Sequence, residues 1–311
     1  MKLGVDRVPE ARKQRIQSLT YWGLQPTLTV LALMLPLLGA EALAYQVFWF
    51  SFIGLLTLLE ILIPARPHWQ ESLNDKLLVL GLVWMASTAG DLFEAAFDES
   101  LFVWLASLRD QFALDIWPSD WPILAQVMLI FVSYEFVNYW YHRGAHQWSW
   151  LWKTSGHGTH HAFKHLTAIN TMANHPLEAL FLMLPRMLVG FLLGGEEVGM
   201  AVGSLFAVTV FMAHCNLELN SKVIGWLFTT NRYHIHHHSM VREESNTNYG
   251  CACILWDRVF GTFSDADTKE AGIGKTQPTY AELFLMPFEE PRSSQVAPLT
   301  QPASVASNDY D

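Results

Sequence analysis

Cysteine and charge are both scarce in this sequence. Its 311 residues include three cysteines, Cys215, Cys251 and Cys253, which are too few for a disulfide framework. Charged residues make up 15% of the chain and the formal net charge is −10, which argues against a nucleic-acid-binding protein, because such proteins need a basic face. The Cys251–Cys253 pair is compatible with a metal site, but we favour two small residues on a strand or core wall.

Nucleotide-binding motifs are missing as well. No GxGxxG follows an expected strand, so neither a bound nucleotide nor a flavin is predicted. The stretch GIGKT at 272–276 resembles the end of a P-loop, but Lys269 occupies the position that requires the first glycine. The N-terminal stretch MKLGVDRVPEARKQRIQSLT has no apolar core directly after its basic residues and does not predict a cleaved signal peptide.

Apolar residues, by contrast, are abundant. The chain is 51% hydrophobic and contains 13 tryptophans. Four apolar segments predict transmembrane helices, at 24–40, 45–63, 77–93 and 121–141. A further apolar stretch at 176–214 is broken near its middle by glycines and glutamates, and we expect a hairpin that dips into the bilayer and returns to the same side. A soluble helical protein with a rich core is the weaker alternative. The predicted fold class is therefore all-α and integral to the membrane.

The distribution of charge predicts the orientation of these spans. Basic residues occur in the N-terminal arm and in the connector at 64–76, namely Lys2, Arg7, Arg12, Lys13, Arg15, Arg66 and Lys76. The positive-inside rule places both segments in the cytoplasm, and it places the acidic stretch 94–120 on the far side. Four spans then return the chain to the cytoplasm just before His142. We expect a bacterial inner-membrane protein, or one of the endoplasmic reticulum, with its histidines on the cytoplasmic side.

These segments divide the chain into five regions. They are an N-terminal cytoplasmic arm (1–23), three transmembrane helices with the acidic connector (24–120), a histidine-rich domain (121–263), a C-terminal cytoplasmic segment (264–290) and a tail (291–311). The tail is polar and rich in proline and serine, which is typical of disorder.

Histidines recur at helical spacing in three motifs. HRGAH contains His142 and His146, HGTHH contains His157, His160 and His161, and HIHHH contains His234, His237 and His238. Residues at i, i+3 and i+4 share one face of a helix. The three histidines of the last motif can therefore converge on one object, while His236 points away. Convergence of several neutral imidazoles is typical of a metal site.

The number of imidazoles predicts two metal ions rather than one. Eight clustered histidines exceed what one ion holds, since a zinc site takes four ligands, whereas two ions with four or five nitrogens each fit the count. His214, at the end of an apolar segment, is a further candidate ligand. His175 is either a ligand or a capping or supporting residue, and His165 and His236 are expected outside the ligand set. Imidazole suits iron, zinc and copper, so the ligands alone do not choose the metal.

The motif set resembles that of the integral-membrane fatty acid hydroxylase/sterol desaturase superfamily, HX₃₋₄H, HXXHH and HXXHH. The resemblance covers about 121–263 and includes HP-E at 175–178, NYG at 248–250 and WDRVFGTF at 256–263. Within the superfamily the chain looks most similar to the branch of bacterial sterol-desaturase-like proteins and alkylglycerol monooxygenase. Soluble di-iron proteins use a Glu-x-x-His pair instead, and this sequence has none.

Membership would imply a catalytic domain at 121–263 with a di-iron centre, although zinc can replace iron during purification. The implied ligands are the eight clustered histidines and His214. Some hydroxylases of the superfamily have another histidine where this chain has Glu218, so His175, Glu218, water or nothing completes the set. Glu135, on the same helical stripe as His142, and Asp257 are candidates to support the ligands from behind, because ligating histidines usually donate their second nitrogen to an oxygen. Alternatively, Glu135 lines the substrate channel and Asp257 caps a helix or turn.

The implied activity is oxidation of a lipid by O₂. Hydroxylation of an unactivated C–H bond is favoured over desaturation, and sterol, fatty acyl, ether lipid and carotenoid substrates all stay open. With no nucleotide or flavin site, electrons would come from an external cytochrome b5, ferredoxin or reductase. A membrane metal transporter is a weaker hypothesis, because the first two predicted spans contain only one charged residue, Glu60. An inactive scaffold is weaker still, because the histidine set is intact.

Overall fold

Helices form most of the regular structure in this computed structural model, which describes residues 9–69, 71–97, 100–101, 103–114 and 116–289. The first half contains α1 (Glu10–Leu19), the π-helix η2 (Thr20–Leu24), α2 (Gln25–Leu37), α3 (Ala42–Leu62), α4 (Leu73–Phe97), α5 (Val103–Gln111) and α6 (Ile123–Gln147). The second half contains α7 (Ser149–Ser155), α8 (His157–His161), η4 (Ala168–Met172), α9 (Glu178–Leu182), α10 (Leu184–Leu193), η5 (Glu196–Val198), α11 (Gly199–His214), α12 (Ser221–Ile224), α13 (Asn231–His237), α14 (Arg242–Ser245), α15 (Leu255–Phe260) and α16 (Tyr280–Leu285). The predicted disordered tail, 291–311, lies outside the described residues.

The described residues contain no strand longer than an isolated bridge, and four helical segments are long and apolar enough to cross a membrane. These segments are Leu43–Leu62, Asn74–Phe97, Ile123–Gln147 and Glu196–His214. Their outer surfaces are apolar: Phe50 of α3 is 78% exposed and Trp84 of α4 is 69% exposed. Large apolar side chains exposed to this extent fit a lipid environment better than water. The predicted all-α membrane architecture is thus confirmed.

The number of predicted spans is correct, but one assignment differs. The first predicted span forms α2, which has 13 residues and continues backwards through η2 into α1. In the predicted hairpin, α9 ends at Leu182 and Pro185 lies in the first turn of α10, so the first half is broken into short helices. The second half has no such break, and Glu196–His214 reaches the length of a span. Within the predicted hairpin at 176–214, only the second half therefore forms a segment long enough to span a membrane.

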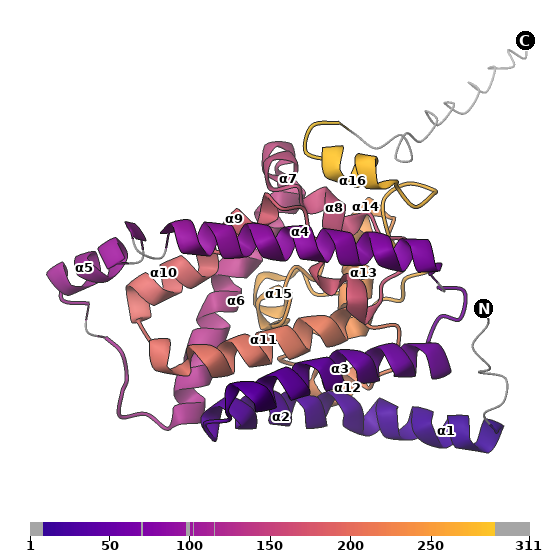
Figure 1. Cartoon of the computed structure of the whole chain (residues 1–311), viewed down its shortest axis with the longest axis horizontal. Helices are drawn as coiled ribbons and strands as arrows, with labels where there is room; N and C mark the ends of the chain where they lie inside the picture. Colours follow the sequence, from indigo (N-terminus) through magenta and orange to yellow (C-terminus); the bar gives the residue numbers. More distant parts are fainter. Residues whose placement is uncertain (1–8, 70, 98–99, 102, 115, 290–311) are drawn as a thin grey trace, which may run out of the picture.

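The central helix is α11, which packs against α2, α6, α13 and η4. Figure 1 shows it running along α2 and α3, and Leu56 of α3 and Val208 of α11 share one buried apolar cluster. A second apolar cluster joins Phe131 of α6 to Leu205 of α11. This packing brings the C-terminal ends of α6 and α11 to the region where α8 and α13 lie.

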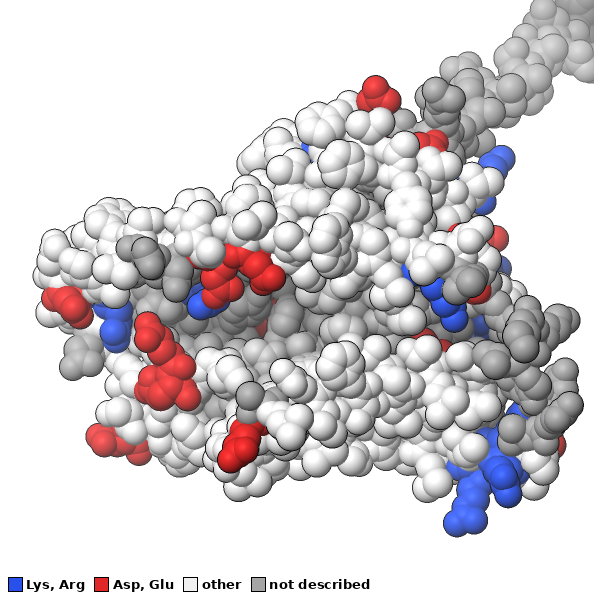
Figure 2. Space-filling view, viewed as in Figure 1, with Lys and Arg blue, Asp and Glu red and all other residues white. Residues whose placement is uncertain are grey.

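Charged side chains gather at the two ends of the molecule. Figure 2 shows most of the visible Asp and Glu side chains at the end where α5 lies. The Lys and Arg side chains gather mainly at the opposite end, where α1 begins and where α3 leads into α4. The basic residues Arg12, Lys13 and Arg15 belong to α1. The ends of the long helices therefore differ in charge, as the sequence predicted.

Candidate metal centre

Four helices supply the histidines of the three motifs and His214. His142 and His146 lie in the last turns of α6, and His214 is the last residue of α11. The HGTHH motif forms α8, and the HIHHH motif forms the end of α13, with His238 as its C-terminal cap. Gly156 makes the turn between α7 and α8: its φ is +71°, and a Cβ there would lie 2.5 Å from the Cβ of His175. Only glycine fits this turn, which aims α8 at the other histidines.

Nine histidines converge in two groups. The five-histidine group consists of His142, His146, His157, His161 and His237, and the four-histidine group consists of His160, His214, His234 and His238. Within each group the candidate ligand atoms all lie within 4.8 Å of one another. The histidine rings of the two groups are in contact, since His161 stacks on His238 with ring centroids 4.2 Å apart. The structure thus brings together all the predicted ligands except His175.

Each HXXHH motif divides its histidines between the two groups. In α8 the i and i+4 residues, His157 and His161, join the five-histidine group, while His160 joins the other. In α13 the i and i+4 residues join the four-histidine group, while His237 joins the other. The expectation that His234, His237 and His238 converge on one object was therefore wrong. Positions i+3 and i+4 are about 100° apart around the helix, which is enough to face two neighbouring ions.

The ring nitrogens are spaced as ligands of an ion would be. In the five-histidine group the Nε2–Nε2 distances are 2.9 Å for His142–His237, 3.1 Å for His146–His161 and 3.3 Å for His146–His157. In the four-histidine group, the pairs His160–His214, His214–His234 and His234–His238 are each 3.1 Å apart. Two nitrogens bound at about 2.1 Å to one ion lie about 3.0 Å apart at a right angle and about 3.4 Å apart in a tetrahedron. The residues present therefore fit a pair of metal ions.

The far side of the five-histidine group is held by oxygen atoms. His142 Nδ1 lies 2.6 Å from the carbonyl oxygen of Tyr249, and His237 Nδ1 lies 2.8 Å from that of Thr247. A carbonyl only accepts, so both rings donate from Nδ1 and keep the lone pair of Nε2 free for a metal. His157 Nδ1 lies 2.5 Å from Oε1 of the buried Glu178, which also accepts from the Tyr141 hydroxyl.

Burial favours the neutral form of five of the grouped imidazoles. It lowers the pKa of His160, His161, His234, His237 and His238 well below the ordinary value, and the neighbouring imidazoles lower it further. Neutral imidazole is the form that binds a metal. The charge state of these residues therefore suits ligation.

His175 and Glu218 are in neither group. His175 Nε2 lies 3.1 Å from the carbonyl oxygen of Phe284, and its Nδ1 accepts from the amide of Leu177 at 3.1 Å, so both ring nitrogens have partners within the protein. This geometry fits the capping role of His175 better than ligation. Glu218 is exposed. His236 points away from the groups, as predicted, and bonds to the side chains of Thr268 and Ser264.

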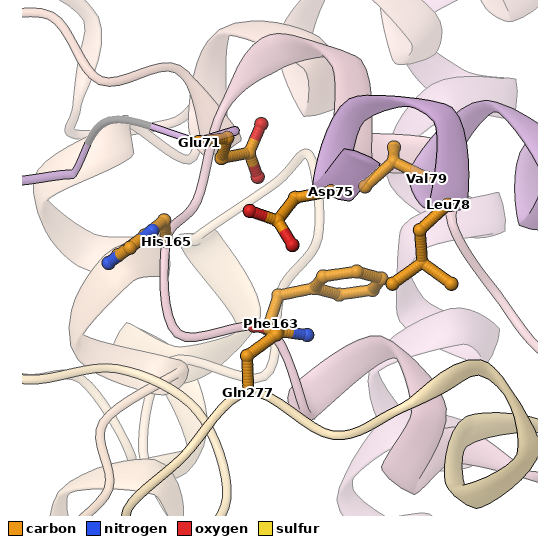
Figure 3. A pocket seen from close by; sticks show the side chains of 7 residues that line it. All are labelled: Glu71, Asp75, Leu78, Val79, Phe163, His165 and Gln277. Atoms are coloured by element: carbon orange, nitrogen blue, oxygen red, sulfur yellow. The ribbon is translucent and has the colours of Figure 1, made fainter. Parts of the chain in front are cut away.

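His165 faces a separate small cavity of about 50 Å³, which is lined by Glu71, Asp75, Leu78, Val79, Phe163, His165 and Gln277. Figure 3 shows the carboxylates of Glu71 and Asp75 on one side of it and His165 on another. Burial raises the pKa of Glu71 to about 7. The Asp75 carboxylate accepts hydrogen bonds from the backbone amide and the hydroxyl group of Ser72. This cavity contains no histidine of the two groups.

The two carboxylates that were predicted to support the histidines, Glu135 and Asp257, accept hydrogen bonds from backbone amides rather than from imidazole rings. Glu135 Oε2 accepts from the amides of Ala252 and Cys253, and Asp257 accepts from the amides of Tyr249 and Gly250. Burial raises the pKa of Asp257 to about 6, although these hydrogen bonds lower it. The carboxylate that does contact a ligand is Glu178, which the spacing of the histidines did not reveal. Its only signal was its place in the HP-E stretch.

Comparison with known proteins identifies the family. The sequence pattern of the fatty acid hydroxylase family matches residues 127–262, which contain all nine grouped histidines. The ornithine lipid hydroxylase of Rhizobium tropici is 32% identical over 256 residues, which cover 78% of this chain and 75% of that protein. The chain belongs to the fatty acid hydroxylase family. It is therefore an integral-membrane oxidoreductase of a metal-dependent family.

More distant relatives match about half of the chain. The alkylglycerol monooxygenase of Xenopus tropicalis is 28% identical over 154 residues, which are 47% of this chain and 31% of that protein. A methylsterol monooxygenase of Arabidopsis thaliana is 27% identical over 158 residues, which are 50% of this chain and 57% of that protein. No solved structure matches the chain.

Proposed function

We propose that this protein is a di-iron hydroxylase that uses O₂ to oxidise an unactivated C–H bond of a membrane lipid. The observation that carries the proposal is the convergence of nine imidazoles in two adjoining groups, beside the C-terminal ends of the apolar helices α6 and α11. All-nitrogen donor sets suit iron, zinc and copper, and the relatives named as hydroxylases and monooxygenases favour the redox-active choice, iron.

The reaction requires a source of electrons. Hydroxylation follows RH + O₂ + 2e⁻ + 2H⁺ → ROH + H₂O, and a bound pair of iron ions supplies the activation of O₂. The sequence offers no nucleotide or flavin motif, so we propose an external cytochrome b5, ferredoxin or reductase as the donor. The histidines would bind the ions through Nε2. Oxygen atoms that contact Nδ1 of His142, His157 and His237 hold those rings in place.

We propose that the histidines face the cytoplasm. Figure 2 shows Lys and Arg side chains gathered at the end where α1 begins and α3 leads into α4, which is the end near α13. The positive-inside rule places such an end on the cytoplasmic side. An electron donor from the cytoplasm would then reach the metal centre without crossing the bilayer.

A lipid of the ornithine lipid type is the first substrate to test. The ornithine lipid hydroxylase of Rhizobium tropici is similar to this chain over 78% of the length of the chain. Hydroxylation is preferred to desaturation because the relatives in question are named hydroxylases and monooxygenases.

The test is expression of the protein in a host that makes ornithine lipids, followed by lipid mass spectrometry under ¹⁸O₂. The expected product is a lipid that has gained one oxygen atom, labelled from ¹⁸O₂, and that is missing with a His142→Ala variant. Purified protein should contain two ions per chain. A loss of two hydrogens without oxygen gain would point to desaturation, and no more than one ion per chain would contradict the dimetal centre.

A transporter is not supported by the spans. Glu60 in α3 accepts from the backbone amides of Ala168 and Asn216 at 2.9 and 2.8 Å, so its carboxylate joins α3 to the segments beside η4 and α11. The Glu60 carboxylate therefore links these segments by hydrogen bonds, and it does not mark the start of a polar route for a transported ion.

A further inference from the structure

The short segment 247–253 contacts two ligands that come from different helices. The carbonyl oxygen of Thr247 accepts from His237 of α13 at 2.8 Å, and that of Tyr249 accepts from His142 of α6 at 2.6 Å. Both histidines belong to the five-histidine group, and their Nε2 atoms lie 2.9 Å apart. One stretch of backbone thus sets the orientation of two neighbouring ligands.

Asn248 gives this segment its shape. It has a φ of +53°, which is uncommon for a residue other than glycine but is tolerated by asparagine. Its side chain donates to the carbonyl oxygens of Tyr233 and Ser264 at 3.0 and 2.8 Å and accepts from the amide of Ser264 at 2.8 Å. These bonds hold the left-handed residue that lies between the two carbonyl groups facing the histidines.

Two buried carboxylates hold the rest of the segment. Asp257 Oδ1 accepts from the amide of Tyr249 at 2.8 Å, and Oδ2 accepts from that of Gly250 at 2.7 Å. Glu135 Oε2 accepts from the amides of Ala252 and Cys253 at 2.7 and 2.8 Å. Both carboxylates are 0% exposed. They come from different helices, α15 and α6, and hold the segment from two directions.

We propose that residues 247–253 form a positioning loop, and that Asp257 and Asn248 set the metal affinity of the five-histidine group by holding this loop in place. The inference rests on the proposed function, since it requires that the histidines bind metal. The loop fixes His142 and His237 with Nδ1 protonated and Nε2 facing the ion. Its effect is specific to one ion, because neither loop carbonyl accepts from a member of the four-histidine group.

Two conservative substitutions separate positioning from general stability. In Asp257→Asn one carboxylate oxygen becomes an amide nitrogen, and since both oxygens accept from backbone N–H groups, a donor then faces a donor. In Glu135→Gln the remaining oxygen can still accept from both amides, and the new NH₂ group faces Asn138, whose own amide can turn to accept it. Asp257→Asn should therefore disturb the loop, whereas Glu135→Gln should preserve it.

Gln126→Leu is the matched control. Gln126 is buried at the far end of α6, and its side chain also makes two hydrogen bonds to backbone, to the carbonyl oxygens of Ser119 and Trp121. The variant loses buried hydrogen bonds without touching a ligand. It reports what loss of stability alone does to metal binding.

The experiment is an anaerobic Fe²⁺ titration of full-length apoprotein against a competing chelator, with thermal unfolding measured before and after loading. Wild type should bind two ions. Asp257→Asn should weaken one of the two binding steps by about 10–100-fold, the usual cost of losing a partner outside the ligand set, and leave the other unchanged. The increase in Tm on binding Fe²⁺ should therefore be smaller for Asp257→Asn than for wild type. Glu135→Gln and Gln126→Leu should keep both steps.

The inference is overturned if Asp257→Asn lowers the Tm of the apoprotein but leaves both steps unchanged, or if Gln126→Leu weakens the same step equally. If Asp257→Asn does not fold, Asn248→Gly replaces it. Glycine keeps the positive φ and removes the side-chain bonds, so the same step should weaken. A wild-type protein that binds no Fe²⁺ would instead refute the proposed function itself.

Discussion

The two histidine groups differ in how their rings are supported. In the five-histidine group, His142, His157 and His237 each place Nδ1 against an oxygen atom. In the four-histidine group, only His214 has such a contact, to the carbonyl of its own helix at Val210, while the buried Nδ1 atoms of His160, His234 and His238 have no hydrogen-bond partner within the described part of the chain. Oxygen acceptors fix the ring and raise the basicity of its other nitrogen. The five-histidine group should therefore bind its ion more tightly.

The number of ligands adds to this difference. Five nitrogens would leave fewer positions for other ligands than four do, so an ion held by the four-histidine group would be more accessible to O₂. One ion would then be structurally fixed, and the other more open to small molecules. The predictions below test this asymmetry.

Three consecutive histidines offer the strongest test. His237 belongs to the five-histidine group, His238 belongs to the four-histidine group, and His236 belongs to neither. His237→Ala and His238→Ala should each lower hydroxylation by more than about 100-fold, because loss of a ligand should exceed the cost of losing an outer partner. Metal analysis should show that His238→Ala, with three ligands left, loses its ion more fully than His237→Ala, with four left.

His236→Ala is the control in the same motif. Its bonds to Thr268 and Ser264 lie outside the metal centre, so two ions per chain should be retained. Equal loss of metal in all three variants would show that the motif acts by folding alone and would remove the distinction between the groups.

Glu178→Gln should produce the next largest effect. The carboxylate lies 2.5 Å from His157 Nδ1, and replacing it removes the negative charge that strengthens this ligand. The affinity of the five-histidine group should fall by about 10–100-fold, with a matching loss of activity at limiting iron. Chelator competition measures the affinity.

Tyr141→Phe provides the comparison for Glu178, because it removes the 3.2 Å hydrogen bond to Glu178 and leaves His157 untouched. Its effect on affinity should be much smaller. If Glu178→Gln lowered the metal affinity of the four-histidine group instead, the assignment of His157 to the five-histidine group would be wrong.

Acid should destabilise the apoprotein. His160, His161, His234, His237 and His238 have folded-state pKa values below the ordinary value, so the unfolded chain binds more protons as the pH falls. Stability is fully present above the unfolded pKa of about 6.5 and declines below it, by about 1.4 kcal/mol per pH unit for each additional proton taken up on unfolding. Denaturant unfolding between pH 7.5 and 5.5 measures the slope.

Metal should oppose this acid effect near neutral pH, because bound ions compete with protons for the same nitrogens. A stability of the apoprotein that stays constant from pH 7.5 to 5.5 would contradict the burial of neutral imidazoles.

The convergence of the motif histidines was predictable because helical spacing is visible in a sequence. Eight of the nine histidines in the three motifs lie in the two groups, as does His214, and the exception is His236. Their division between the groups was not predictable, because it depends on how α8 and α13 are rotated against α6 and α11. The sequence alone shows which side chains share a helix face, but not what lies opposite that face.

The supporting contacts were harder to predict for a different reason. Glu135 and Asp257 were recognised as relevant carboxylates, but their partners are backbone amides, which every residue except proline has. The carbonyl groups of Thr247 and Tyr249 that accept from the histidines likewise have no signature in the sequence. The spans show the same limit: composition indicated apolar runs, but local breaks such as the one between α9 and α10 at Pro185 decided which runs form one long helix.

The smallest effect is expected at Cys251, whose sulfur lies 3.4 Å from His142 Nδ1. Burial raises the pKa of this thiol well above the ordinary value, so it stays protonated and is a poor metal ligand. The ring nitrogen it approaches is also the one that donates to Tyr249, on the side away from the metal. Cys251→Ala should therefore keep two ions per chain and near-normal hydroxylation, as measured by metal analysis and lipid mass spectrometry. Loss of the more tightly bound ion would mean that the five-histidine group includes a sulfur ligand, and that its affinity does not come from oxygen-supported imidazoles.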